Sequence, residues 1–222
     1  MTGFLMSRQS FRSWLSLAVC LILLPGFLTA QQPDDLVDIM ELDSTIVVEL
    51  KYATRDNFLQ DTLYSANICL LRRAVAERLV KVHRSLQQRG FGLKIWDGYR
   101  PLSVQKKMWE KMPDPSYVAN PQRGSNHNRG AAVDVTLVDL NGNELEMPTE
   151  FDDFSRRARS DYLFVSDPVK KNRTILQDAM RAQGFQTTSS EWWHFNDKDC
   201  KKYSVLDFPL EKFIKKQNNM MK

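Results

Sequence analysis

Two short stretches of this chain carry residue types that could bind a metal ion and activate water. The first is the run from Ser125 to Asp134, which includes His127, and the second begins at Glu191 and ends at His194. Zn²⁺ binds imidazole nitrogen and carboxylate oxygen readily, and a catalytic zinc uses three protein ligands and keeps one position open for water. His127, Asp134 and His194 would form such a triad, and Glu191 would remain as a base beside the water.

The spacing within each stretch bears on this interpretation. Gly130 lies between His127 and Asp134 and lets the backbone turn tightly, so that a loop residue and a strand residue can converge on one ion. Glu191 and His194 would share a face on a helix, but in a regular strand they would point to opposite faces. The intervening tryptophans favour a strand, so we expect Glu191 at its irregular start.

The same motifs also fit an ordinary protein core. Two tryptophans packed inside the fold, with a histidine hydrogen-bonded beside them, would give the second motif without any metal. The chain contains only three histidines, however, and two of them fall in these stretches. The coincidence of both motifs favours the metal site.

The composition is that of a folded protein without a nucleic-acid partner. Of the 222 residues, 42% are hydrophobic and 26% are charged, which argues against extensive disorder and predicts one compact domain, or two. The net charge of +4 comes from 31 basic and 27 acidic residues. Arg8 and Arg12 lie in a segment that we expect to be removed, which leaves +2 and no basic stripe.

The first thirty residues are typical of a secretory signal. Arg8 and Arg12 give a positive start, and Trp14–Phe27 is an apolar run too short for a comfortable membrane span. Ala30 ends the run with a small residue. We therefore expect a signal peptide over residues 1–30 and export to the periplasm or the outside. An uncleaved anchor is the alternative, which the shortness of the apolar run disfavours.

The mature chain would then be a single catalytic domain over residues 31–222, with no stable membrane span. A lipoprotein attached at Cys20 is another alternative, but bulky Val19 precedes it where that cleavage needs a small residue. Removal of the signal leaves Cys69 and Cys200 in an oxidising compartment, where a disulfide could persist. Two buried free thiols are the other possibility, and the sequence does not decide between them.

A mix of separate strands and helices must position the two motifs. We expect strands over Thr45–Leu50, Leu93–Trp96, Ala132–Val138 and Glu191–Phe195, and helices over Leu70–Gln88, Pro101–Lys111 and Pro168–Gln183. In the third strand Val133 and Val135 alternate with Asp134, which puts Asp134 on the other face. His83 lies among basic residues of the first helix and is expected to be solvated. The pattern predicts a single-domain α+β fold, with a mixed or antiparallel central sheet, flanking helices and the zinc site at the sheet.

Arg100 is a further candidate because of where it falls. It lies at a strand-to-helix corner, just before Pro101, where side chains often point into a site. The alternative is a structural arginine that pairs with Asp97. Position alone favours neither.

Several segments of the chain together point to one family. They are Lys51-Tyr52-Ala53-Thr54 with Asn57-Phe58, Trp96-Asp97-Gly98-Tyr99-Arg100-Pro101, Ser125 to Leu137, Phe151-Asp152 and Glu191-Trp192-Trp193-His194. This set resembles the D-Ala-D-Ala dipeptidases of the VanX type, which are zinc peptidases related to D,D-carboxypeptidases. The segments occur in the family's order and span nearly all of the chain from Leu50 to His194.

The resemblance implies a role for each matched side chain. It implies one zinc ion per chain held by His127, Asp134 and His194, a general base and acid at Glu191, an oxyanion-stabilising cation at Arg100, a substrate-carboxylate site at Ser125, and an ammonium site at Asp152 with Tyr52 nearby and Tyr64 as an aromatic pocket wall. One departure concerns the pocket. Relatives often carry Arg-Ser-His shortly after the Phe-Asp pair, and here Asp161 follows Arg159-Ser160, which puts the exact substrate preference in question.

We therefore predict a zinc metallopeptidase that hydrolyses the small dipeptide D-Ala-D-Ala to two D-alanines, in cell-wall metabolism or glycopeptide resistance. The first alternative is a D,D- or L,D-carboxypeptidase that trims peptidoglycan stem peptides on the same scaffold, with an open groove instead of a closed end. The second is a cell-wall-binding module with a vestigial metal site. Glu191 argues against that module, because binding alone needs no base. The oligomeric state stays open.

Overall fold

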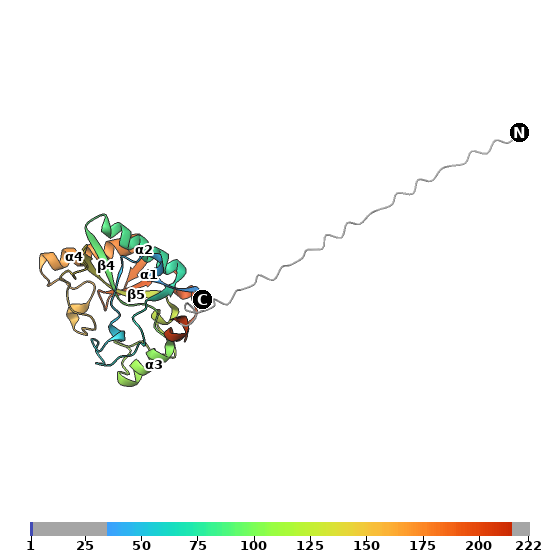
Figure 1. Cartoon of the computed structure of the whole chain (residues 1–222), viewed down its shortest axis with the longest axis horizontal. Coiled ribbons are helices and arrows are strands. Elements are labelled where there is room, and N and C mark those ends of the chain that lie inside the picture. Colours follow the sequence, from blue (N-terminus) through green and yellow to red (C-terminus); the bar gives the residue numbers. More distant parts are fainter. Residues whose placement is uncertain (2–34, 215–222) are drawn as a thin grey trace. The chain divides into compact units, whose positions relative to one another are not determined.

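A five-stranded mixed sheet forms the centre of the domain (Figure 1). The computed structural model describes Met1 and residues 35–214, so the predicted signal peptide lies outside the described residues apart from Met1. In spatial order the strands are β2 (Val47–Val48), β4 (Phe91–Asp97), β5 (Ala132–Asp139), β7 (His194–Asp197) and β6 (Phe185–Thr187). β2 runs parallel to β4, and the other neighbours are antiparallel. The predicted α+β class is confirmed.

Helices cover the sheet, and a separate two-stranded ribbon lies beside it. The helices are α1 (Ile39–Leu42), α2 (Arg73–Gln87), α3 (Leu102–Lys111) and α4 (Asp167–Ala182), and the ribbon pairs β1 (Leu36–Asp38) with β3 (Leu70–Arg72). Helix α2 contacts β4 and α4, and α4 also contacts β5 and β6. In Figure 1, α1, α2 and α4 gather on one side of β5, and α3 lies on the other. The described part of the chain also contains the 3₁₀ turns η2 (Lys51–Ala53), η3 (His127–Arg129), η4 (Arg156–Ala158) and η5 (Cys200–Lys202).

Local sequence explains the two long helices. In α2 the side chains of Val75, Leu79, Val82 and Leu86 are buried at helical spacing, which gives the apolar stripe that a helix packs on a sheet. Helix α4 begins where the hydroxyl of Ser166 accepts a hydrogen bond from the Val169 amide, and a proline in its first turn suits the helix start.

Three predicted elements differ from the structure at their ends. The helix expected over Leu70–Gln88 begins only at Arg73, because Leu70–Arg72 pairs with β1 as strand β3. A run of buried leucines fits either period, so the sequence alone did not separate strand from helix. The strand expected over Thr45–Leu50 is regular only at Val47–Val48, and the strand expected from Glu191 begins at His194.

His83 was predicted to be solvated, and this prediction is wrong. Its side chain is 2% exposed, its Nδ1 accepts a 3.1 Å hydrogen bond from the Leu93 amide, and its Nε2 lies 3.0 Å from Thr45 Oγ1. Burial lowers the pKa of this imidazole. His83 thus connects α2 to β4 through a hydrogen bond. The basic residues next to it in the sequence suggested an exposed side chain, but His83 lies on the buried face of the helix.

Among the described residues, Cys69 and Cys200 are both buried and free. Cys69 lies directly before β3, and Cys200 begins η5. A Cβ atom added at Gly98 would lie 2.7 Å from Cys69 Sγ. Glycine is therefore required at the corner that follows β4, where the next side chains enter the candidate site.

Candidate active site

Strand register brings three functional side chains into one row across the sheet. In β5, Asp134 lies opposite His194 of β7 on one side and opposite Asp97 of β4 on the other. Directly opposed residues in antiparallel strands have Cβ atoms about 5 Å apart. Pairing of distant segments thus places Asp134 and His194 side by side.

His127 reaches the same place from the 3₁₀ turn η3, which precedes β5. Gly130 closes this turn with a left-handed φ of 65° and an amide that donates to the His127 carbonyl at 3.0 Å. A Cβ at this position would lie 2.8 Å from Leu36 Cδ2. The expected role of Gly130 is thus reinforced by packing, since both the backbone conformation and the space require glycine.

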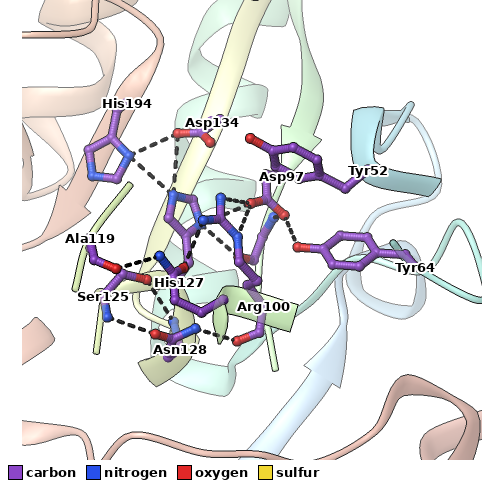
Figure 2. A network of polar contacts seen from close by, with 12 residues as sticks. Tyr52, Tyr64, Asp97, Arg100, Ala119, Ser125, His127, Asn128, Asp134 and His194 are labelled. Carbon is purple, nitrogen blue, oxygen red and sulfur yellow. Dashed lines mark hydrogen bonds and ion pairs between the residues drawn. The ribbon is translucent and has the colours of Figure 1, made fainter. Parts of the chain in front are cut away.

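The three candidate ligands converge on one point (Figure 2). His194 Nδ1 lies 2.9 Å from Asp134 Oδ1 and 3.1 Å from His127 Nε2, and His127 Nε2 lies 3.4 Å from Asp134 Oδ1. Ligands held about 2.1 Å from a tetrahedral zinc ion lie roughly 3.4 Å from one another. The triangle therefore has the dimensions of three zinc ligands drawn slightly together.

Neighbouring acceptors set the tautomers of both imidazoles. His127 Nδ1 lies 2.8 Å from the carbonyl oxygen of Gly98, and His194 Nε2 lies 3.1 Å from Asn196 Oδ1. With a metal ion bound, each of these nitrogens would donate its proton to an oxygen, which would leave the lone pairs of His127 Nε2 and His194 Nδ1 for the ion. The side-chain amide of Asn126 donates from Nδ2 to Asn196 Oδ1 at 2.7 Å and holds this acceptor in place.

The electrostatics of the triangle favour a cation. Burial alone would lower the pKa of His194, but hydrogen bonding and the charge of Asp134 raise it to about 9. Burial alone would raise the pKa of Asp134, but the charge of His127 and hydrogen bonds from both histidines hold it well below its usual range. The buried carboxylate of Asp134 thus stabilises positive charge on the two histidines. It would stabilise a metal cation bound between the three side chains in the same way.

Glu191 lies at the same cavity on a segment anchored in the core. Trp192 and Trp193, which follow it, are almost fully buried, and the Trp192 amide donates to the Ala158 carbonyl at 2.8 Å. The hydroxyl of Ser160 donates to the Glu191 carbonyl at 2.9 Å. The tryptophans are thus ordinary core residues that also fix Glu191, and burial raises the pKa of its carboxyl.

Arg100 both pairs with Asp97 and lines the cavity, which are the two alternatives that its position in the sequence left open. It pairs with Asp97 through Nε at 3.1 Å and through Nη2, and its Nη1 donates to Gln105 Oε1 at 2.9 Å. Its guanidinium also lies over the ring of Tyr52, 5.0 Å from the centroid, and lines the cavity. These bonds use three of the five N–H donors of arginine, so two remain for a ligand.

Tyr64 differs from its predicted role as a pocket wall. It is 3% exposed and is not among the residues that line the cavity. Its hydroxyl donates to Asp97 Oδ1 at 2.6 Å, and its ring packs edge-on to Tyr52 with centroids 5.9 Å apart (Figure 2). Because its hydroxyl is hydrogen-bonded to Asp97, Tyr64 helps to hold the Asp97–Arg100 pair in place and does not face the cavity.

Asp152 and Ser125 do line the cavity. Asp152 accepts hydrogen bonds from the Tyr52 hydroxyl at 3.1 Å and from the Phe58 amide at 3.2 Å. Burial raises its pKa to about 7, and its backbone has a left-handed φ of 57°, a strained conformation of the kind found at functional sites. Ser125 Oγ accepts from the Asn128 amide at 3.3 Å, which leaves its own hydrogen for a ligand.

The cavity has a volume of about 330 Å³ and contains every predicted site residue except Tyr64. Asp161, the departure noted in the sequence, does not line it and instead pairs with Arg159 at 2.9 Å near the surface. Sequence analysis missed Asn126, Asn196 and Lys201 as lining residues. The two-residue period of a strand could have pointed to Asn196, which lies two positions after His194, but no signal marked Lys201.

Comparison with known proteins places the whole domain in one group. The D-ala-D-ala dipeptidase family of the M15 peptidases matches residues 32–215. The D-alanyl-D-alanine dipeptidase of Escherichia coli K12 is 37% identical over 180 residues, which are 81% of this chain and 93% of that protein. That of Enterococcus faecium is 33% identical over 186 residues, or 73% and 92% of the two chains. That of Streptomyces coelicolor is 32% identical over 201 residues, or 79% and 98%.

Proposed function

Because this chain belongs to the D-ala-D-ala dipeptidase family, we propose that it hydrolyses D-Ala-D-Ala to two D-alanines with one zinc ion at His127, Asp134 and His194. The observation that carries this proposal is the triangle of ligand atoms with both imidazole tautomers set by neighbours. Glu191 lies at the same cavity without being needed as a ligand. A binding module with a vestigial metal site would need no such base.

The residues divide the chemistry among themselves. When bound, zinc supplies a Lewis acid and a water that ionises near pH 7. Glu191 takes the proton of the attacking water at its carboxylate and returns it to the amide nitrogen as the carbon–nitrogen bond breaks. Its pKa is raised by burial, which makes it a stronger base than an exposed glutamate.

Arg100 provides a fixed positive charge for the oxygen that becomes negative when water attacks the peptide carbonyl. Its pair with Asp97 and its bond to Gln105 hold the guanidinium in one orientation before the reaction. A charge that is positioned in advance costs no reorganisation in the transition state, and loss of one such donor commonly lowers the rate by about 10²–10³.

The cavity offers an anionic group for the free ammonium of a dipeptide. Tyr52 and Phe58 hold Asp152 in a half-buried position at the cavity. An internal peptide would present no cation here and would leave the charge of this carboxylate without a counter-charge, which is costly. The volume of about 330 Å³ lies at the lower end of the range for small-molecule pockets.

One observation keeps the carboxypeptidase alternative open. A second cavity of about 190 Å³ adjoins the first, and the two share Ser116, Tyr117, Phe154, Ser190 and Glu191 as lining residues. The rings of Tyr117 and Phe154 meet with centroids 4.5 Å apart. If these rings part, a longer stem peptide has room to extend past them.

Release of D-alanine by the purified protein tests the proposal. The substrates are D-Ala-D-Ala, L-Ala-L-Ala and a pentapeptide ending in D-Ala-D-Ala, each with and without a zinc chelator. We expect chelator-sensitive cleavage of D-Ala-D-Ala alone, and a loss of about 10²–10⁴-fold in kcat for Glu191→Gln with zinc still bound. Cleavage of the pentapeptide instead would establish the carboxypeptidase. No cleavage by zinc-loaded protein would refute both enzymes and favour the binding module.

We also propose that the chain is exported. The support is the sequence of residues 1–30, a positive start followed by a short apolar run. Among the described residues no helix is both long and apolar enough to cross a membrane. Amino-terminal sequencing of the protein recovered from outside the cytoplasm tests this proposal, with cleavage after Ala30 as the expected result and an intact start as the contrary one.

A further inference from the structure

Lys201 is a charged residue of the catalytic cavity to which the proposed mechanism gives no role. It belongs to the 3₁₀ turn η5, shortly after β7, and lines the cavity together with Ser125, Asn126 and Asn196. Its side chain is exposed. Among residues 35–214 no carboxylate lies within 4.0 Å of its ammonium group, whereas the neighbouring Lys202 pairs with Asp199 at 2.7 Å.

The turn that carries Lys201 is held in place on both sides. The Lys202 amide donates to the Asp199 carbonyl at 2.8 Å, and Arg78 pairs with the Asp199 carboxylate at 2.9 Å. Cys200, on the other side, is buried. The backbone therefore fixes the origin of the Lys201 side chain at the cavity rim, while its long stem leaves the ammonium free to meet a ligand.

The charges of the cavity balance in a way that singles out two residues. Arg100 is already paired with Asp97. A zinc ion would be balanced by Asp134, which is one of its ligands, and by Glu191, which lines the same cavity. The remaining charged groups among the lining residues, histidines aside, are Asp152 and Lys201.

Asp152 and Lys201 are these two groups, and they match the two ends of a dipeptide. Asp152 lies beside Tyr52, from whose hydroxyl it accepts a hydrogen bond. Lys201 lines the cavity, and the segment after it lies against the loop that carries Ser125, because Arg129 Nη1 donates to the Tyr203 carbonyl at 2.6 Å and the Leu206 amide donates to the Asn128 carbonyl at 2.8 Å. Figure 2 shows Tyr52 and Ser125 on opposite sides of His127. Two residues of extended peptide span about 7 Å, so a dipeptide can place its peptide bond near the metal site with one charged end toward each side.

Resting on the proposed function, we propose that Lys201 binds the C-terminal carboxylate of the substrate and, with Asp152, selects a zwitterionic dipeptide. Ser125 is placed to donate a hydrogen bond to this carboxylate, but a neutral hydroxyl does not compensate its charge. A charge-assisted hydrogen bond from an ammonium is roughly twice as strong as a neutral one. Lys201 thus contributes to substrate affinity more than to the chemical step.

The test compares Lys201→Met, which keeps most of the stem and removes the charge, with Lys201→Arg, which keeps the charge. KM is measured for D-Ala-D-Ala, and Ki is measured for D-Ala-D-Ala amide, which lacks the carboxylate, as a competitor. We expect Lys201→Met to raise KM by about 5- to 30-fold with kcat nearly unchanged. The Ki of the amide should be the same for Lys201→Met as for wild type. Lys201→Arg should keep both the KM and the Ki near their wild-type values. Lys202→Met is the matched control and should change neither constant.

An unchanged KM in Lys201→Met, or an equal change for dipeptide and amide, would overturn the proposal. Failure of the proposed function would look different, because wild-type protein would then cleave no dipeptide at all. In that case calorimetric binding of D-Ala-D-Ala and of its amide to the zinc-loaded wild type and to Lys201→Met decides. A preference for the carboxylate that disappears in the variant supports the role of Lys201, and the absence of any preference refutes it.

Discussion

Replacing Tyr64 with phenylalanine separates a supporting role from a substrate-binding one. The change removes only the hydroxyl that donates to Asp97 at 2.6 Å, and it keeps the ring that packs on Tyr52. Asp97 is fully buried and also accepts hydrogen bonds from Arg100 and from the Gly98 amide. The variant therefore weakens a buried network without opening a cavity.

The structure sets the size of the effect. A hydrogen bond to a charged group contributes about 1.5–3 kcal/mol to stability. For a domain of this size each kcal/mol shifts Tm by about 2–4 °C, so Tyr64→Phe should lower Tm by roughly 3–12 °C. The KM for D-Ala-D-Ala should stay within about twofold of wild type, because Tyr64 does not line the cavity. A modest fall in kcat is expected, since Arg100 shares the weakened Asp97.

Thermal unfolding of zinc-loaded protein and steady-state kinetics measure both quantities. Tyr52→Phe is the matched control, because it belongs to the same aromatic cluster but its hydroxyl bonds Asp152 at the cavity. That variant should raise KM with a smaller loss of stability. If Tyr64→Phe instead raised KM several-fold and left Tm unchanged, its hydroxyl would contact substrate and the reasoning would be wrong.

Three further outcomes test other parts of the site and fold. Asn196→Leu removes the acceptor that orients His194 and should weaken zinc binding by about 10–100-fold in a chelator competition; an unchanged affinity would show that Asn196 does not orient the ligand. Asp152 must be ionised to bind an ammonium and burial raises its pKa to about 7, so the KM for D-Ala-D-Ala should fall as pH rises through this region. The same fall of KM in Asp152→Asn would contradict that assignment. Burial lowers the pKa of His83, so its contribution to stability is present above the unfolded value of 6.5 and is lost as pH falls below it. The drop in Tm between pH 7 and 5.5 should be smaller in His83→Gln, and an equal drop would count against this role.

Most of the hypothesis of a zinc site followed from the residue types of the chain alone. Histidines and carboxylates bind zinc because of their own atoms, so His127, Asp134 and His194 could be chosen as candidates before any fold was known. The helical period in α2 and the alternation in β5 are likewise written in the local sequence, because burial of one face requires them. Local period and ligand chemistry are properties of short segments, and a sequence displays them directly.

The tertiary structure decided whatever depends on which distant segments meet. Pairing of β5 with β7 sets Asp134 beside His194, and the corner after β4 supplies the Gly98 carbonyl that orients His127. The same kind of contact moved Tyr64 behind Asp97, and other long-range packing buried His83 against β4 and brought Lys201 to the cavity rim. Burial and hydrogen-bond partners are set by neighbours far along the chain, so side chains with similar local surroundings can face solvent, core or substrate.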